Sequence, residues 1–304
     1  MKKVKIYQVD AFTTQSFGGN PAGVIIDATE LTESEMQKIA KEMNCSETAF
    51  VLPSEDPAAD FRVRFFTPLE EVDLCGHATI ATFHVMVEEG RIKLNSNEVT
   101  LHQETKAGIL PVQIKRKQAG SFEIIMGQSL PQILETNNDT SKIAALIGLR
   151  EADLKFNNLP MQIVSTGLPD LMVPVRDLAS LKKASPDYVA LANYQKEKGF
   201  ISIHAFTFET INKANTLHAR DFAPSVGINE EAATGTANGA LGAYLVVNRA
   251  LPLNDKKIIT NVEQGYFMDR PSEILVEISH QDGAITDVKV GGSAVTVLEG
   301  FLQF

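Results

Sequence analysis

Two short glycine motifs are the first places in the sequence where chemistry is expected. They read Gly76-His77-Ala78 and Gly235-Thr236-Ala237, and each stands where a strand-like segment gives way to a helix-like one. The first N–H groups of a helix have no partner within the helix and carry the positive end of its dipole. Because glycine lets a ligand approach the backbone closely, we predict two cradles for a small anion such as a carboxylate.

A weak internal repeat relates the two motifs. Arg64-Phe65-Phe66-Thr67-Pro68 matches Arg220-Asp221-Phe222-Ala223-Pro224, with Arg, Phe and Pro at the same spacing. Each match follows an alternating strand and precedes the glycine that opens a helix. The segment between the match and that glycine is three residues longer in the second half. Gly19-Asn20-Pro21 similarly matches Gly167-Leu168-Pro169. We therefore expect two similar halves, each a mainly antiparallel sheet curled around one buried helix, whose helix N-termini could face each other across a cleft.

The pattern of apolar residues predicts the elements that position these motifs. Polar and apolar residues largely alternate, as in half-buried antiparallel strands, over residues 5–12, 61–66, 216–222 and 273–278. A helix is expected over residues 32–43, where Thr32 and Glu35 form a capping box. Further helices are expected to begin near Gly76 and Gly235. The helix from Gly235 carries small, apolar residues on almost every side, so we expect it to be buried inside the structure.

Length and charge limit the function. A chain of 304 residues is comfortable for two domains, and the turn-rich residues 118–121 are the best boundary. We predict an N-terminal half over residues 1–118, completed by a C-terminal strand at 292–304, and a C-terminal half over residues 119–291. The net charge of −10 argues against nucleic acid or anionic membrane as a partner. With two cysteines and no signal peptide or membrane span in the sequence, a cytoplasmic protein is expected.

Taken in order, these motifs resemble the successive signatures of the PhzF family of phenazine biosynthesis. The segments that carry the resemblance are Gly19 to Val24, Ser46-Glu47-Thr48-Ala49-Phe50-Val51, Arg64 to Pro68, Leu74 to Thr79, and Ala233 to Ala237. The resemblance spans essentially the whole chain. It implies an α+β fold of the diaminopimelate epimerase type, with two pseudo-symmetric halves, each a barrel-like sheet around a central helix, and the active site between them. It also implies a homodimer and an isomerase that needs neither metal nor coenzyme.

Carried over by position, the resemblance assigns Glu47 as the glutamate that accepts a proton and returns it elsewhere on the substrate. A carboxylate removed from water has its neutral form favoured, so we expect a raised pKa for Glu47. Glu231 stands where the family commonly has Asp, and Ala232 replaces a Pro, so Glu231 is expected as a further polar contact. The substrate, a small carboxylate, would be held by Gly76, His77, Glu231, Gly235 and Thr236.

Other chemistries are less well supported by the residues. A two-thiol racemase is disfavoured because Thr234 stands at the counterpart of Cys75. A catalytic Cys75–His77 nucleophile pair is not expected, since residues two apart at a helix start do not face each other. Cys75 is instead expected to be a small buried hydrophobe. His77 and His84 lie about 10.5 Å apart along a helix, too far to share a metal ion, and no other His or Cys pair has ligand spacing.

Two other classes of function stay open at this point. One is an epimerase or racemase of the same fold that uses Glu47 with another base. The other is a catalytically silent protein that binds a small anion, since a fold does not fix a function.

Overall fold

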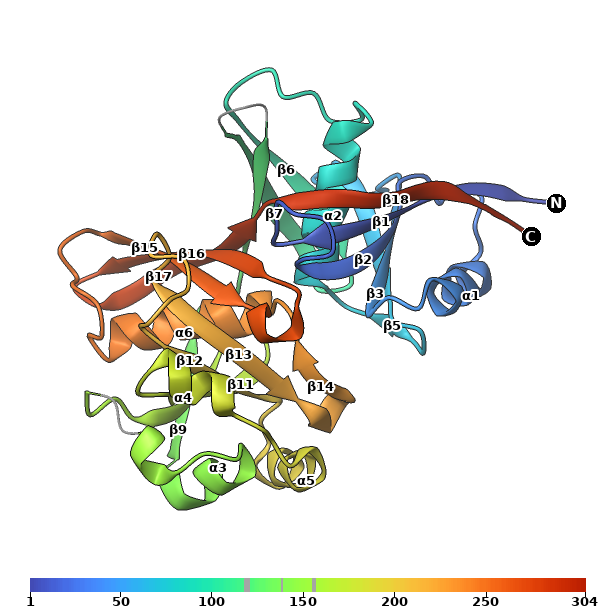
Figure 1. The fold of residues 1–304 in the computed structure, drawn as a ribbon. Helices are drawn as coiled ribbons and strands as arrows, with labels where there is room; N and C mark the ends of the chain where they lie inside the picture. Colours follow the sequence, from blue (N-terminus) through green and yellow to red (C-terminus); the bar gives the residue numbers. More distant parts are fainter. Residues whose placement is uncertain (118–120, 138, 155–156) are drawn as a thin grey trace. The chain divides into compact units, whose positions relative to one another are not determined.

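The chain forms two compact units (Figure 1), Met1–Gly127 with Gly291–Phe304, and Gln128–Val290. The computed structural model describes residues 1–117, 121–137, 139–154 and 157–304. The boundary predicted at residues 118–121 therefore falls largely outside the described residues. The strands on either side of it pair with each other, and both belong to the first unit.

The first unit is a mixed sheet that packs around one helix. Strand β1 pairs antiparallel with β18 and β2, β2 runs parallel to β3, β3 is antiparallel to β4, and β4 continues through β6 to β7 and β8. Helix α2 contacts β1, β2, β3, β8 and β18 (Figure 1). The elements are β1 (Lys3–Ala11), β2 (Asn20–Ile25), α1 (Glu33–Met43), β3 (Glu47–Leu52), β4 (Phe61–Phe66), β5 (Glu71–Val72), α2 (Gly76–Glu88), β6 (Glu98–Thr105), β7 (Gly108–Arg116), β8 (Phe122–Gly127) and β18 (Ala294–Gln303).

The second unit repeats this order of strands. Strand β10 pairs antiparallel with β9 and β11, β11 runs parallel to β12, β12 is antiparallel to β13, and β13 continues through β15 to β16. Helix α6 contacts β10, β11, β12 and β16. The elements are β9 (Gln132–Asn137), α3 (Thr140–Leu146), β10 (Met161–Ser165), β11 (Pro169–Pro174), α4 (Leu178–Lys183), α5 (Tyr188–Lys198), β12 (Ser202–Thr207), β13 (Leu217–Ala223), β14 (Ile228–Glu231), α6 (Gly235–Val247), β15 (Lys257–Gln264), β16 (Ser272–Gln281) and β17 (Ala284–Gly292).

The predicted repeat is visible in matching side-chain contacts. Arg64 Nε and Nη2 donate to the Glu71 carboxylate at 2.7 and 2.8 Å, and its guanidinium lies over the Phe66 ring. Arg220 makes the same two bonds to Glu230 at 2.8 Å and lies over the Phe222 ring. In each unit the acidic partner stands five residues before the helix-opening glycine, so the repeat extends from the strand to the helix start.

The predicted helices form for the expected reasons. Helix α1 begins after Thr32, whose hydroxyl accepts from the Glu35 N–H while the Glu35 carboxylate accepts from the Thr32 N–H, as a capping box requires. It ends at Asn44 in the left-handed conformation and packs Met36 and Ile39 against the sheet. Helices α2 and α6 are buried on almost every side. Across the described ranges, no helix combines the length and apolar character needed to span a membrane.

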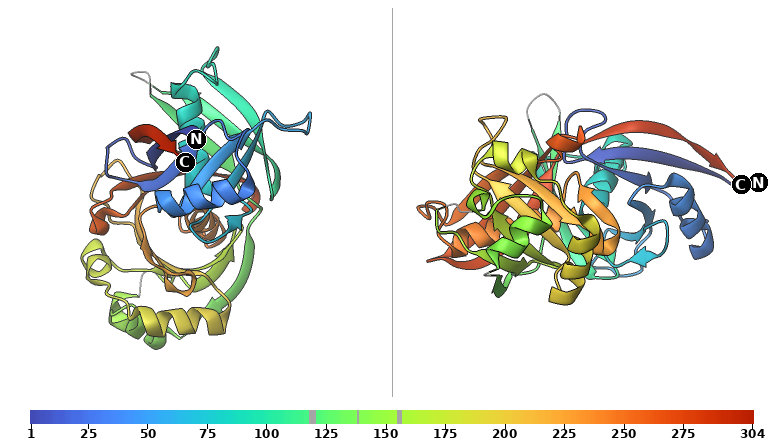
Figure 2. Two further views of the ribbon diagram at one scale, coloured as in Figure 1. Left: turned by 90° about the vertical axis from the view of Figure 1, so that its right-hand side faces the viewer. Right: turned by 60° about the horizontal axis from the view of Figure 1, so that its bottom comes forward.

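The two chain ends lie side by side in the first unit. Strands β1 and β18 pair along their whole length, from Lys3 opposite Gln303 to Ala11 opposite Ala294 (Figure 2). The Lys2 N–H also donates to the carbonyl of Phe304. The last strand of the chain therefore completes the sheet around α2.

Replacing Gly242 by Ala should destabilise the second unit. A Cβ at this position in α6 would lie 2.6 Å from Val276 Cγ1 and 3.0 Å from Ile278 Cδ1, which are buried on β16. We expect the free energy of unfolding in urea to fall by about 1–3 kcal/mol, despite the better helix propensity of Ala. Gly127→Ala is the control, because a Cβ there meets no described atom within 4 Å. An equal effect of the two substitutions would contradict this packing.

Candidate active site

Glu47 lies at the start of a strand and next to the start of a helix. It is the first residue of β3, directly opposite Ala22 of the parallel strand β2, while His77 is the second residue of α2. Glu47 Oε2 lies 3.1 Å from His77 Nε2, and the two side chains are 19% and 7% exposed. The first unit thus brings together three of the predicted site residues, Glu47, Gly76 and His77.

Three further side chains surround the His77 ring. Ser46 Oγ lies 3.2 Å from Nε2, Asn20 Nδ2 lies 3.3 Å from Nδ1, and Cys75 Sγ lies 3.5 Å from Nδ1. Sequence reasoning placed Ser46 and Asn20 only within family motifs and gave them no role. The available signal was their place in two motifs that run into strands β2 and β3. Both strands contact α2, the helix that carries His77.

The Glu47–His77 pair is an ion pair, and the prediction of a raised Glu47 pKa is wrong. Burial alone would raise the pKa of Glu47, but the close contact with His77 and the charge of that ring outweigh burial and hold it below its ordinary value. Burial would lower the pKa of His77, yet its contacts with Cys75 and Glu47 raise it well above the ordinary value. Glu47 therefore rests as a carboxylate, ready to accept a proton.

Cys75 and His77 face each other, contrary to the prediction that they would not. Cys75 has φ −141° and ψ 122°, so it is extended backbone before the helix, and the rule for neighbours on a helix surface does not apply to it. It is buried as expected, and its Sγ lies beside the His77 ring. Burial and then the charge of Glu47 raise the pKa of Cys75 to about 11. The thiol stays protonated at neutral pH and is a poor nucleophile or base.

Glu47, Cys75 and His77 have the spacing of a metal site, so the prediction that no other His or Cys pair has ligand spacing is wrong. Ligand atoms of Glu47, Cys75 and His77 all lie within 4.8 Å of one another. Cys75 Sγ lies 3.8 Å from His77 Nε2, a separation that suits two ligands of a tetrahedral zinc ion. An ion held there would coordinate the Glu47 oxygen, so metal binding and proton transfer by Glu47 would compete.

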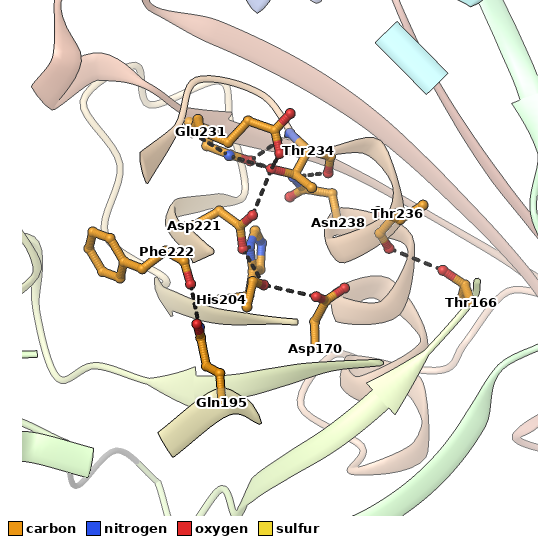
Figure 3. Close-up of polar contacts among 12 residues, drawn as sticks. Thr166, Asp170, Gln195, His204, Asp221, Phe222, Glu231, Thr234, Thr236 and Asn238 are labelled. Carbon is orange, nitrogen blue, oxygen red and sulfur yellow. Dashed lines mark hydrogen bonds and ion pairs between the residues drawn. The ribbon is translucent and has the colours of Figure 1, made fainter. Parts of the chain in front are cut away.

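The second unit brings together the other predicted residues, Glu231, Gly235 and Thr236. Gly235 and Thr236 open α6, and Glu231 ends β14. Thr234 is the N-cap of α6, but its side chain does not cap the helix. Thr234 Oγ1 instead lies 2.9 Å from Glu231 Oε2 and 2.9 Å from Asp221 Oδ2 (Figure 3).

Next to Thr234 lies a cluster of four buried polar side chains that sequence reasoning missed. Asp221 Oδ1 lies 2.6 Å from Ser202 Oγ and 3.0 Å from His204 Nδ1, and Ser202 Oγ lies 2.9 Å from Asp170 Oδ1. All four side chains are at most 2% exposed. Asp221 was noted only as part of the repeat. The available signal was the Asp at a repeat position that holds Phe65 in the first half.

Strand registers show that Ser202 is the counterpart of Glu47. In the first unit Ala22 of β2 is opposite Glu47, and in the second unit Asp170 of β11 is opposite Ser202. The antiparallel neighbours give the same alignment, since the residues after Glu47 and Ser202 face the Phe residues of the two repeat motifs. A hydroxyl thus replaces the candidate acid/base in the second half.

The second half carries its acidic groups at other positions of the repeat. Glu231 stands four residues before Gly235, where the first half has Val72 before Gly76. Burial and then the charge of Asp221 raise the pKa of Asp170 well above its ordinary value. The carboxyl oxygens of Asp221 and Glu231 both lie 2.9 Å from Thr234 Oγ1 and so are within about 6 Å of each other, where two charges repel by about 3 kcal/mol.

Substituting Glu47 should change the titration of His77. In the native protein His77 should titrate above its ordinary pKa of about 6.5, and Glu47→Gln should lower this pKa because the carboxylate charge is lost. The raised pKa of His77 stabilises the fold below about pH 6.5, and this contribution is lost as pH rises through the folded pKa. The lowered pKa of Glu47 stabilises above about pH 4.3, and is lost as pH falls through its folded pKa.

The measurement is an NMR titration of the ring nitrogens of labelled histidine. Exposed His102 on β6 serves as the internal comparison. A His77 signal that does not respond to Glu47→Gln would contradict the ion pair.

Comparison with known proteins places the chain in a family. A family model for PhzC-PhzF phenazine biosynthesis-like proteins matches residues 9–300. An uncharacterized isomerase of Clostridium acetobutylicum is 37% identical over 304 residues, which is 99% of this chain and 99% of the relative. The trans-2,3-dihydro-3-hydroxyanthranilate isomerase of Pseudomonas aeruginosa is 28% identical over 293 residues, which is 96% of each chain.

Solved structures agree with this placement. A Bacillus anthracis phenazine biosynthesis protein of the PhzF family matches with a TM-score of 0.90 at 35% identity, over 100% of both chains. A hydroxyproline epimerase of Agrobacterium vitis matches with a TM-score of 0.64 at 12% identity, over 99% of this chain and 91% of the other, which shows a shared fold alone. The predicted α+β fold and family are confirmed, and the predicted isomerase class agrees with the names of the relatives. The chain belongs to the PhzC-PhzF family of phenazine biosynthesis-like proteins.

Proposed function

We propose that this protein is an isomerase that moves a proton within a small carboxylate-bearing substrate, with Glu47 as the single acid/base and no coenzyme. The observation that carries the proposal is the Glu47–His77 ion pair, in which a half-buried carboxylate is held ionised by a buried imidazolium. A base for carbon acids must be ionised at rest and shielded from water. Glu47 meets both requirements.

His77 supports both halves of the reaction. When Glu47 takes a proton from a substrate carbon, it becomes neutral, and the electron pair left on the substrate makes the substrate more negative. The His77 cation, 3.1 Å from Glu47, then stabilises that charge in place of the Glu47 charge. Glu47 returns the same proton to a second carbon, the carbon–carbon double bond shifts accordingly, and the ion pair is restored.

The helix starts supply groups suited to the substrate's carboxylate. The N–H groups that follow Gly76 in α2 and Gly235 in α6 have no partners within their helices, and neither N-cap side chain occupies them in the described structure. Thr236 adds a hydroxyl at the second helix start. The homodimer implied by the family resemblance belongs to the same proposal.

The first substrate to test comes from a relative. The name of the Pseudomonas aeruginosa relative specifies trans-2,3-dihydro-3-hydroxyanthranilate, which carries a carboxylate, and that relative covers 96% of this chain. Glu231 and Ala232 depart from the usual Asp-Pro of the family, so a related carboxylate with a different ring substituent is the next candidate.

Glu47→Gln should abolish turnover of trans-2,3-dihydro-3-hydroxyanthranilate while leaving its binding within a few-fold of the native protein. The amide keeps the shape of the side chain but cannot accept the proton, and a positioned acid/base is worth roughly 10²- to 10⁴-fold in rate. Turnover is followed by NMR of the product and binding by calorimetry. Glu42→Gln, on the exposed face of α1, is the control. Near-native turnover by Glu47→Gln would refute the mechanism.

Cys75→Ala should retain turnover to within about tenfold, because a thiol with a pKa near 11 is protonated and contributes no base. Cys45→Ala is the matched control, since Cys45 is also buried in the first unit. Circular dichroism checks that both variants fold. A loss of a hundredfold or more in Cys75→Ala alone would favour the epimerase alternative, in which a thiol acts as the second base.

A further inference from the structure

Glu47, Cys75 and His77 form a cluster whose distances fit one tetrahedral zinc ion. Zinc bonds of about 2.3 Å to sulfur and about 2.1 Å to nitrogen or oxygen place sulfur about 3.6 Å from nitrogen, and nitrogen about 3.4 Å from oxygen. Cys75 Sγ lies 3.8 Å from His77 Nε2, and Glu47 Oε2 lies 3.1 Å from the same nitrogen. Both distances differ from the tetrahedral values by about 0.3 Å or less, so small side-chain movements suffice to bind the ion.

The backbone fixes the positions of all three ligands. Cys75 is the extended residue before α2, His77 is the second residue of that helix, and Glu47 is the first residue of β3. Cys75 and His77 are buried, whereas the Glu47 side chain is 19% exposed. The two buried ligands therefore hold a fixed geometry, and the exposed part of Glu47 gives an ion an entry path from solvent.

Zinc can replace protons at this cluster without changing its net charge. The free cluster holds a Glu47 carboxylate, a His77 imidazolium and a Cys75 thiol, which sum to zero. Zinc binds a thiolate and a neutral imidazole, so one proton leaves Cys75 Sγ and one leaves His77 Nε2 for solvent. Two positive charges arrive with the ion as two depart with the protons. Burial of the charged ion therefore carries no added net charge into the site.

Two neighbouring side chains complete the surroundings that such an ion requires. A histidine that binds zinc through one nitrogen usually donates from the other to an oxygen. His77 Nδ1 lies 3.3 Å from the Asn20 amide nitrogen, and the amide oxygen accepts from Nδ1–H if the amide is turned over. Ser46 Oγ lies 3.2 Å from Nε2, where it can hydrogen-bond a water in the fourth position of the ion.

We propose that Glu47, Cys75 and His77 bind a zinc ion reversibly and that the zinc-bound site is inactive. Thiolate and imidazole ligands favour zinc over Mg²⁺ and Ca²⁺, which take oxygen ligands. The zinc site stands independently of the proposed function, whereas the inactivity rests on that function. A Glu47 oxygen that coordinates zinc no longer accepts a proton from a substrate carbon.

The test titrates the full chain, freed of metal with EDTA and then of EDTA, with Zn²⁺ and with Co²⁺ as a spectroscopic probe. Calorimetry should give about one zinc ion per chain. Cobalt should give the near-ultraviolet absorption band of a thiolate–cobalt bond, together with the strong visible bands of tetrahedral coordination. Zn²⁺ should remove these bands by displacing cobalt, whereas Mg²⁺ should leave them unchanged.

Variants of the ligands assign the bands to this cluster. Cys75→Ala should abolish the thiolate–cobalt band. Cys75→Ala and His77→Asn should each weaken zinc binding by about a hundredfold or more, because changes to outer-shell partners alone cost about 10- to 100-fold. Cys45→Ala is the matched control, since it removes the other buried cysteine of the first unit. It should keep both the band and the zinc affinity.

Three results would overturn the zinc site. They are a native protein without the thiolate–cobalt band, a band that persists in Cys75→Ala, and zinc binding that is unchanged in His77→Asn. If Cys75→Ala does not fold, the native spectrum and His77→Asn still decide. None of these measurements requires turnover, so their failure is distinct from failure of the Glu47 mechanism.

The inactive state has its own readout. Turnover of trans-2,3-dihydro-3-hydroxyanthranilate by the native protein should fall in proportion to the zinc bound and return when EDTA removes the ion. Full turnover at saturating zinc would overturn coordination through Glu47, even with the thiolate–cobalt band present.

Discussion

The proposed chemistry of the first unit depends on one ion pair, Glu47 with His77. A carboxylate or an imidazolium alone at this depth would be strongly disfavoured, and each is kept charged by the other. The pair forms because the parallel strand β3 starts beside the N-terminus of α2, so the first residue of one element meets the second residue of the other. The two ring nitrogens of His77 also contact Ser46, Asn20 and Cys75. A protonated His77 presents an N–H group at each nitrogen. Nε2–H faces Glu47 and Ser46, and the amide oxygen of Asn20 accepts from Nδ1–H if the amide is turned over.

The two halves share a backbone plan but divide the chemistry between them. Both keep the Arg–Glu pair that holds the repeat strands, and both open a buried helix with glycine. They differ where the side chains could react. The first half has Glu47 at the strand start, whereas the second has Ser202 there and places its acidic groups on neighbouring strands. A duplicated backbone with divergent polar positions thus places the candidate base, Glu47, in one half and a serine at the matching position of the other.

Much of the fold could be predicted from the sequence because its signals are local. The Thr32–Glu35 capping box, the alternating strands and the glycines before two apolar helices are each read within a few residues of the chain. That Gly76 and Gly235 hold equivalent positions followed from the repeat. The sign of the Glu47 pKa shift, the Cys75–His77 contact and the links of Asp221 could not be predicted in this way. They depend on the register between strands and on which side chains share a buried space, and residues far apart in the chain, such as Asp170 and Asp221, supply them.

The central claim is that Glu47 carries one proton from a donor carbon to an acceptor carbon of the same substrate molecule. The most direct measurement uses trans-2,3-dihydro-3-hydroxyanthranilate labelled with deuterium at the donor carbon, converted in ordinary water in a single turnover. With Glu47 half-buried beside His77, the account predicts that part of the deuterium appears at the acceptor carbon. An acceptor carbon whose new hydrogen comes entirely from water would contradict transfer by a single carboxylate.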